Sequence, residues 1–129
     1  MRTRPPSVLL AEDAESLLVL YRFWLEQEGF EVVSAADGAQ ALAAVGRFGL
    51  PDVALVDVEM PVLGGIDLCR RLLRIDSELP VVFLTALDEV PAAARTAGAR
   101  EVLRKPCAGE DLIRALREAL SAARSPLPA

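Results

Sequence analysis

The chain has 129 residues, enough for one domain of ordinary size and too few for two. Hydrophobic residues make up 53 % of the chain and charged residues 26 %, a composition that excludes a disordered segment. The net charge is -5 and Lys and Arg form no block, so we expect no nucleic-acid binding through phosphate neutralisation.

The first half of the chain alternates short apolar runs with longer segments of helical periodicity. The predicted elements are strand 7–11, helix 15–28, strand 31–35, helix 37–48 and strand 52–57. Gly29 supplies the stop of the first helix, and Asp37 is expected to cap the second. The third strand, "DVALVD", is a continuous apolar run, which is typical of a strand buried on both faces.

The second half repeats the same alternation. The predicted elements are helix 65–75, strand 80–85, helix 88–97, strand 101–104 and helix 110–123. The helix over 88–97 is rich in alanine, and we expect Pro91 in its first turn, where proline is tolerated. Strands that alternate with helices through short loops predict right-handed crossovers and a doubly wound parallel sheet, an α/β fold.

Neither a membrane span nor a secretion signal is predicted. No apolar run exceeds six residues, and no adequate apolar stretch follows the basic start of the chain. Cys69 and Cys107 match no CxxC pattern, so we interpret them as reduced thiols in a cytoplasmic protein.

In such folds a ligand binds beyond the carboxyl ends of the strands, so the residues at that edge are the candidate site. Glu12 and Asp13 follow the first strand, Asp57 ends the third, Thr85 ends the fourth and Lys105 follows the fifth. Three carboxylates within about 5 Å repel by roughly 3 kcal/mol per pair at an effective dielectric near 20. All the ligands are hard oxygens, so the edge predicts a Mg²⁺ site.

The chain has no histidine, which excludes a Ser-His-Asp site, most zinc chemistry and a phosphohistidine carrier. A metal bound in this way typically engages a phosphoryl group, with Lys105 and Thr85 on its other oxygens. The nucleophile is then a carboxylate, and Asp57, central in the sheet, is the candidate for an aspartyl phosphate. Taken singly, each of these residues is more often a turn, a cap or a solvated charge. Their joint placement favours the site.

The stretches "LLAED", "ALVDVEMPVLGG", "VVFLTA" and "LRKP", in this order and spacing, resemble the receiver domain of two-component response regulators. The resemblance covers residues 7 to 122 and is to the single-domain form of the chemotaxis regulator. It implies a flavodoxin-like five-stranded sheet of order 2-1-3-4-5 with five helices. The domain would span 7–123, with a disordered start at 1–6 and a flexible tail or linker start at 124–129.

The resemblance also assigns roles at the acidic edge. Asp57 is the phosphoacceptor, and Glu12 and Asp13 are the acidic pair that holds Mg²⁺ together with Asp57. The backbone carbonyl of Glu59 completes the metal shell. The Glu59 side chain is an extra acid near the phosphoryl group, and the sequence does not fix its effect on hydrolysis.

On the other side of the acceptor, the resemblance makes Thr85 the switch hydroxyl, with Ala86 beside it as a phosphate-binding position. Lys105 is the phosphate-binding lysine, and the bond from Lys105 to Pro106 is expected to be cis. Val102 stands where the family usually has Tyr or Phe, so the usual aromatic switch is missing. We expect phosphorylation to shift the fourth helix and its loop instead of an aromatic rotamer.

The implied function is a phosphorelay. A sensor histidine kinase or a phosphotransfer protein supplies the phosphoryl group, and the receiver then changes the surface that a downstream target binds. No enzyme activity is expected beyond the chain's own phosphorylation and dephosphorylation. The alternatives are a phosphorylation-independent binding module and a receiver excised from a larger regulator or hybrid kinase. A haloacid-dehalogenase-type phosphatase is disfavoured because it wants Asp at position 59.

The first predicted helix carries Leu18, Val19 and Phe23 in addition to its core positions. If these side chains form an exposed patch, they predict a partner surface or a weak homodimer. The alternative, apolar side chains scattered singly over the surface, is more common.

Overall fold

A computed structural model describes residues 4–124, and these residues form a five-stranded parallel sheet with the order β2-β1-β3-β4-β5. The strands are β1 (Ser7–Ala11), β2 (Glu31–Ala35), β3 (Val53–Asp57), β4 (Val81–Thr85) and β5 (Glu101–Arg104). The predicted fold class and strand order are both confirmed.

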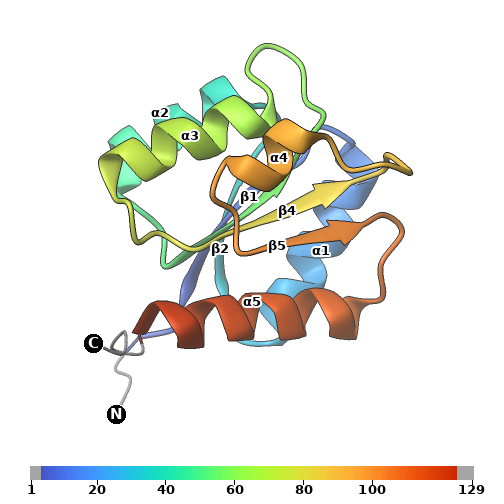
Figure 1. Ribbon diagram of the computed structural model, residues 1–129. Coiled ribbons are helices and arrows are strands. Elements are labelled where there is room, and N and C mark those ends of the chain that lie inside the picture. Colours follow the sequence, from blue (N-terminus) through green and yellow to red (C-terminus); the bar gives the residue numbers. More distant parts are fainter. Residues whose placement is uncertain (1–3, 125–129) are drawn as a thin grey trace.

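Five helices cover the sheet on both faces (Figure 1). They are α1 (Glu15–Gln27), α2 (Gly38–Phe48), α3 (Gly65–Ile75), α4 (Ala92–Thr96) and α5 (Gly109–Arg124). α2, α3 and α4 lie on one face, and α1 and α5 lie on the other. No helix within residues 4–124 is long and apolar enough to cross a membrane.

The sheet divides the core into two clusters because successive side chains of a strand point to opposite faces. In β3, Val53 and Leu55 pack with α1 and α5, whereas Ala54 and Val56 pack with α2, α3 and α4. All five residues of β3 and all five of β4 are buried, as expected for central strands of a doubly wound sheet. Asp57 thus ends a strand that has no contact with water along its length.

The fourth helix is shorter than the sequence predicts. The prediction of a helix over 88–97 is wrong at both ends, because α4 holds only Ala92–Thr96. Pro91 is the N-cap and restricts Val90 before it to extended backbone, so the helix cannot begin earlier. At the other end Gly98 adopts φ +106, a left-handed conformation that ends the helix.

The described residues also bear on the predicted ends of the domain. The disordered start expected over 1–6 stays a prediction. At its end, the carbonyl of Pro6 accepts from the backbone N–H of Glu31 at 2.9 Å. Arg4 lies 3.2 Å from the carboxylate of Asp52. Residues 1–3 and 125–129 lie outside the described part of the chain, so those parts of the prediction stay untested.

The loop between β3 and α3 is packed closely against the end of β3. A Cβ at Gly65 would overlap the backbone carbonyl of Asp57, and one at Gly38 would overlap the carbonyl of Leu63. The N–H groups of these two glycines instead donate to Val58 and Leu63, both at 3.1 Å. The side-chain-free glycine at 65 therefore lets α3 begin directly beside the end of β3.

Candidate functional site

Strand register brings the sequence-predicted residues to one edge of the sheet. Ala11 is paired with Val56, and Asp57 is paired with Leu84, so the carboxyl ends of β1, β3 and β4 lie level. The residues at these ends follow from that alignment. Glu12, Asp57 and Thr85 are the buried polar side chains of the described chain, each at most 1 % exposed, whereas Asp13 beside them is exposed.

A single ammonium group connects two of the acids. Nζ of Lys105 lies 3.0 Å from Oε1 of Glu12 and 3.1 Å from Oδ2 of Asp57. Burial alone would lower the pKa of the Lys105 ammonium, but its hydrogen bonds and charge pairs with both acids raise the pKa above the ordinary value. The ammonium is therefore positively charged at neutral pH and faces the candidate acceptor.

The charge of Lys105 does not fully offset the other influences on the pKa of Asp57. Burial first, and then the hydrogen bond and the charge of Glu12, raise the pKa of the Asp57 carboxyl to about 7. Lys105 lowers the pKa but does not cancel these effects. A second positive charge is needed to keep Asp57 ionised well below neutral pH and ready to act as a nucleophile.

The three acids have the geometry and chemistry for such a charge. One carboxylate oxygen each of Glu12, Asp13 and Asp57 lies within 4.8 Å of the others. Oε2 of Glu12 accepts from the N–H of Ala14 at 3.1 Å, which fixes its orientation. Hard oxygen ligands, one of them exposed toward solvent, fit a Mg²⁺ ion that keeps several waters. The predicted acidic residues are thus brought together and suit the predicted metal.

Glu59 makes contacts that the sequence did not predict. Its backbone N–H donates to Oδ1 of Asp57 at 3.1 Å. Its carboxylate accepts from Oγ1 of Thr85 at 3.0 and 3.2 Å, and the N–H of Ala86 lies 3.4 Å from it. The available signal was the extra acid two residues after Asp57, but the sequence did not show which way its side chain turns.

The fifth strand supplies two further predicted features. The peptide bond between Lys105 and Pro106 is cis, as expected. Val102 is half-buried and packs on the core beneath α2, α3 and α4. A cavity of about 390 Å³ borders Val102, Val90 and Ala94, in the region between α4 and β5.

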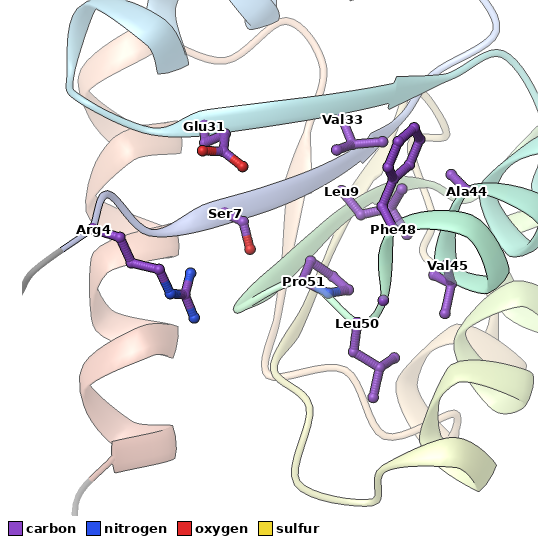
Figure 2. A pocket seen from close by; sticks show the side chains of 11 residues that line it. Arg4, Ser7, Leu9, Glu31, Val33, Ala44, Val45, Phe48, Leu50 and Pro51 are labelled. Carbon is purple, nitrogen blue, oxygen red and sulfur yellow. The ribbon is translucent and has the colours of Figure 1, made fainter.

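Another cavity lies at the opposite edge of the sheet. It has a volume of about 220 Å³ and is bordered by residues at the amino ends of β1 and β2, among them Ser7 and Glu31 (Figure 2). Phe48 and Leu50 form its apolar side. Because this cavity contains none of the clustered acids, we place the chemistry at the carboxyl edge.

The comparisons with known proteins agree with this geometry. The response regulator receiver domain model matches residues 8–117. The chain is 38 % identical over 116 residues to the sensory transduction protein RegX3 of Mycobacterium tuberculosis, covering 88 % of this chain and 50 % of that protein. It is 38 % identical over 122 residues to the DNA-binding response regulator MtrA of Mycolicibacterium smegmatis, covering 93 % and 53 %. The chain therefore spans about half the length of these relatives.

Solved structures show the same fold. A response regulator receiver domain protein from Clostridium thermocellum superposes with a TM-score of 0.84 at 30 % identity, covering 91 % of this chain and 95 % of that one. A CheY-like receiver domain protein from Methanospirillum hungatei reaches a TM-score of 0.86 at 24 % identity, covering 92 % and 96 %. The chain belongs to the response regulator receiver domain family, and the resemblance seen in its motifs is confirmed.

Proposed function

We propose that the chain accepts a phosphoryl group on Asp57 from a phosphohistidine of a partner protein, a sensor histidine kinase or a phosphotransfer protein. The observation that carries the proposal is the convergence on one buried carboxylate. Asp57 is met by Lys105, which follows β5, and lies beside Glu12, which follows β1. Thr85 ends the neighbouring strand β4, and Ala86 follows it.

The transfer follows from the placement of these groups. An Asp57 oxygen attacks phosphorus, the P–N bond to the partner's imidazole breaks, and the electron pair of that bond stays on the imidazole nitrogen. Lys105 neutralises one equatorial oxygen of the phosphoryl group, and the Thr85 hydroxyl and the Ala86 N–H donate to another. Water later attacks the same phosphorus, which releases inorganic phosphate and restores the Asp57 carboxylate.

Glu12, Asp13, Asp57 and the backbone carbonyl of Glu59 would hold Mg²⁺. When bound, the ion supplies positive charge that stabilises the ionised acceptor and the charge of the transferring group. Glu12 contributes to this site from its buried position, and Asp13 contributes from the exposed side. This arrangement agrees with the raised pKa of Asp57, which a bound cation would lower.

The transferred group acts on a signalling surface in the proposed function. Thr85 lies at the start of the β4–α4 loop, so a change in its bonding reaches α4 and β5, where a downstream target would bind. We place the protein in the cytoplasm and expect this domain itself to bind no nucleic acid. The names of the relatives describe transcriptional or DNA-binding regulators; those activities belong to the relatives.

The chain is proposed to act only on its own phosphoryl group and not as an enzyme on a separate substrate. A haloacid-dehalogenase-type phosphatase would need a second Asp two residues after the nucleophile. Here that residue is Glu59, whose carboxylate accepts a hydrogen bond from Thr85. Steady release of phosphate from a small phosphate ester, in proportion to the protein present, would contradict the proposal.

The main experiment is intact mass spectrometry after incubation with Mg²⁺ and a small-molecule phosphodonor such as acetyl phosphate. The native chain should gain one phosphoryl group, and Asp57→Asn should gain none. Asp67→Asn is the matched control because it removes an exposed acid on α3 and should be phosphorylated normally. No gain on the native chain, either from this donor or from a phosphohistidine protein, would favour the phosphorylation-independent module.

A further inference from the structure

The carboxylate of Glu59 lies against the groups proposed to receive the phosphoryl oxygens. Thr85 donates its hydroxyl to this carboxylate at 3.0 Å, and the Ala86 N–H points to it at 3.4 Å. Thr85 is wholly buried and has no access to water as an alternative partner. The two donors of the phosphoryl site are therefore engaged by an anion that belongs to the chain itself.

A hydroxyl has one proton to donate, so Thr85 cannot bond to Glu59 and to a phosphoryl oxygen at the same time. The N–H of Ala86 is limited in the same way. In addition, a carboxylate and a phosphoryl group that share these donors would be two anions in contact, which repel each other. Occupation by one anion requires the departure of the other.

The backbone of the same residue is tied to the acceptor. The N–H of Glu59 donates to Oδ1 of Asp57, while the side chain reaches across to β4. Glu59 is only half-buried, so its carboxylate can swing out to solvent without opening the core. The residue thus spans the acceptor and the switch, and only its side chain has to move.

We propose that Glu59 is an internal ligand of the phosphoryl-binding donors, which holds Thr85 in the unphosphorylated chain and is displaced when Asp57 receives its phosphoryl group. This proposal rests on the proposed function for the displacement step. Glu59 acts through Thr85 and is a positioning residue. It makes phosphorylation an exchange of one anion for another, with Thr85 engaged in both states.

The first test needs no phosphodonor and no metal. In ¹H–¹⁵N spectra of the free chain, Glu59→Ala should shift the amide signals of Thr85, Ala86 and Leu87, because the Leu87 N–H is itself bonded to the Thr85 hydroxyl at 3.1 Å. Glu89→Ala, which removes an exposed acid of the same loop, is the matched control and should leave these signals in place. Unshifted signals in Glu59→Ala would overturn the contact.

The second test measures displacement with beryllofluoride and Mg²⁺, which together mimic the phosphoryl group on an aspartate. Glu59→Ala should bind the analogue about tenfold more tightly than the native chain, since one charged competitor for a hydrogen bond is removed. In a Thr85→Ala background, the same substitution should change the affinity less than about threefold, because the shorter of the two shared hydrogen bonds, that of the Thr85 hydroxyl, is gone.

The outcomes of this binding test distinguish a failure of the Glu59 proposal from a failure of the proposed function. If the native chain binds the analogue and Glu59→Ala binds it no more tightly, the internal ligand is wrong and the proposed function stands. An equal gain in both backgrounds would also overturn the proposal, because it would show simple charge repulsion without competition for Thr85. If neither the native chain nor any variant binds the analogue, the proposed function fails as well.

Discussion

α3 and α4 cover the same face of the sheet, but they are built differently. α3 has 11 residues and buries Leu68, Cys69 and Leu72 completely. α4 has only five residues, all of them described by the structure, and Ala94 is the one that is buried. Burial of apolar surface is the main source of helix stability in proteins, so α3 is fixed and α4 is weakly held.

The difference matches the tasks proposed for the two regions. α3 begins where Gly65 meets the carbonyl of Asp57, so the proposed acceptor is set against a helix with a well-buried face. α4 follows Thr85 after a six-residue loop and can be shifted at small free-energy cost. The proposed function needs both properties: a rigid site at Asp57 and a surface next to it that shifts easily.

Core truncation should give the largest contrast between the regions. Leu72→Ala should lower the free energy of unfolding by about 2–5 kcal/mol, because it leaves a cavity in the packed face of α3. Ala94→Gly should lower it by only about 1 kcal/mol, the usual effect of glycine in a helix. Urea unfolding of both variants checks the contrast, and equal losses would show that α4 is as firmly held as α3.

The next largest effect is that of the Asp57 charge on the free energy of unfolding. It concerns the region beside α3. The pKa of Asp57 is raised to about 7, so between about pH 4 and pH 7 the native chain holds a proton that the unfolded chain has released. The free energy of unfolding therefore falls as the pH rises through this range, and it levels off above it. Asp57→Asn removes this slope and should stabilise the metal-free chain by about 2 kcal/mol at pH 8.

Unfolding at pH 4, 6 and 8 without Mg²⁺ checks the sign of that prediction. The difference between Asp57→Asn and the native chain should shrink toward zero at pH 4. Saturating Mg²⁺ should stabilise the native chain more than Asp57→Asn, by about 2.7 kcal/mol at a hundredfold excess over the Kd. A difference that grows as the pH falls would contradict the raised pKa.

Hydrogen exchange tests the comparison directly. Binding of beryllofluoride with Mg²⁺ should change amide protection over residues 86–104 by about tenfold, which corresponds to about 1.4 kcal/mol of local stability. Residues 65–75 in α3 should change less than about twofold. Asp57→Asn serves as the control and should show neither change. Unaltered protection over 86–104 would contradict the expectation that the α4 region responds in place of the missing aromatic at Val102.

The smallest predicted effect concerns strain in the rigid region. Val62, in the loop before α3, has φ 68 and is 83 % exposed, an unfavourable backbone conformation for a β-branched residue. Val62→Asn should raise the free energy of unfolding by about 1 kcal/mol, because asparagine tolerates this conformation better. Val19→Asn, at an exposed position within α1, should give no gain.

The sequence predicted most of this architecture because the central strands are unbroken apolar runs. "VALVD" and "VVFLT" have no other stable location than the middle of a parallel sheet, and their last residues are then brought to one edge. The N-cap at Asp37 also formed as predicted, and its side chain accepts from the N–H of Gln40 at 2.8 Å. Local chemistry determines such features, so a single sequence is enough to find them.

The errors arose where side-chain direction or weak packing decided the outcome. α4 was predicted to be too long because alanine favours a helix at every position, whereas Pro91 and Gly98 set its real ends. The Glu59–Thr85 contact depends on how β3 and β4 are aligned and which way a flexible side chain turns. In the predicted patch on α1, Val19 and Phe23 are exposed but Leu18 packs on the core, so a homodimer stays a prediction.

The ion pair from Lys105 to Glu12 affects when the site is completed during synthesis and folding. It joins residues 93 positions apart, and Asp57 lies between them in the sequence and beside them in space. A chain emerging from the ribosome completes its acidic edge only after the fifth strand has docked. An unfinished or truncated molecule therefore carries every acid of the site without its ammonium group. Under the proposed function, the chain can receive a phosphoryl group only once its folding is complete.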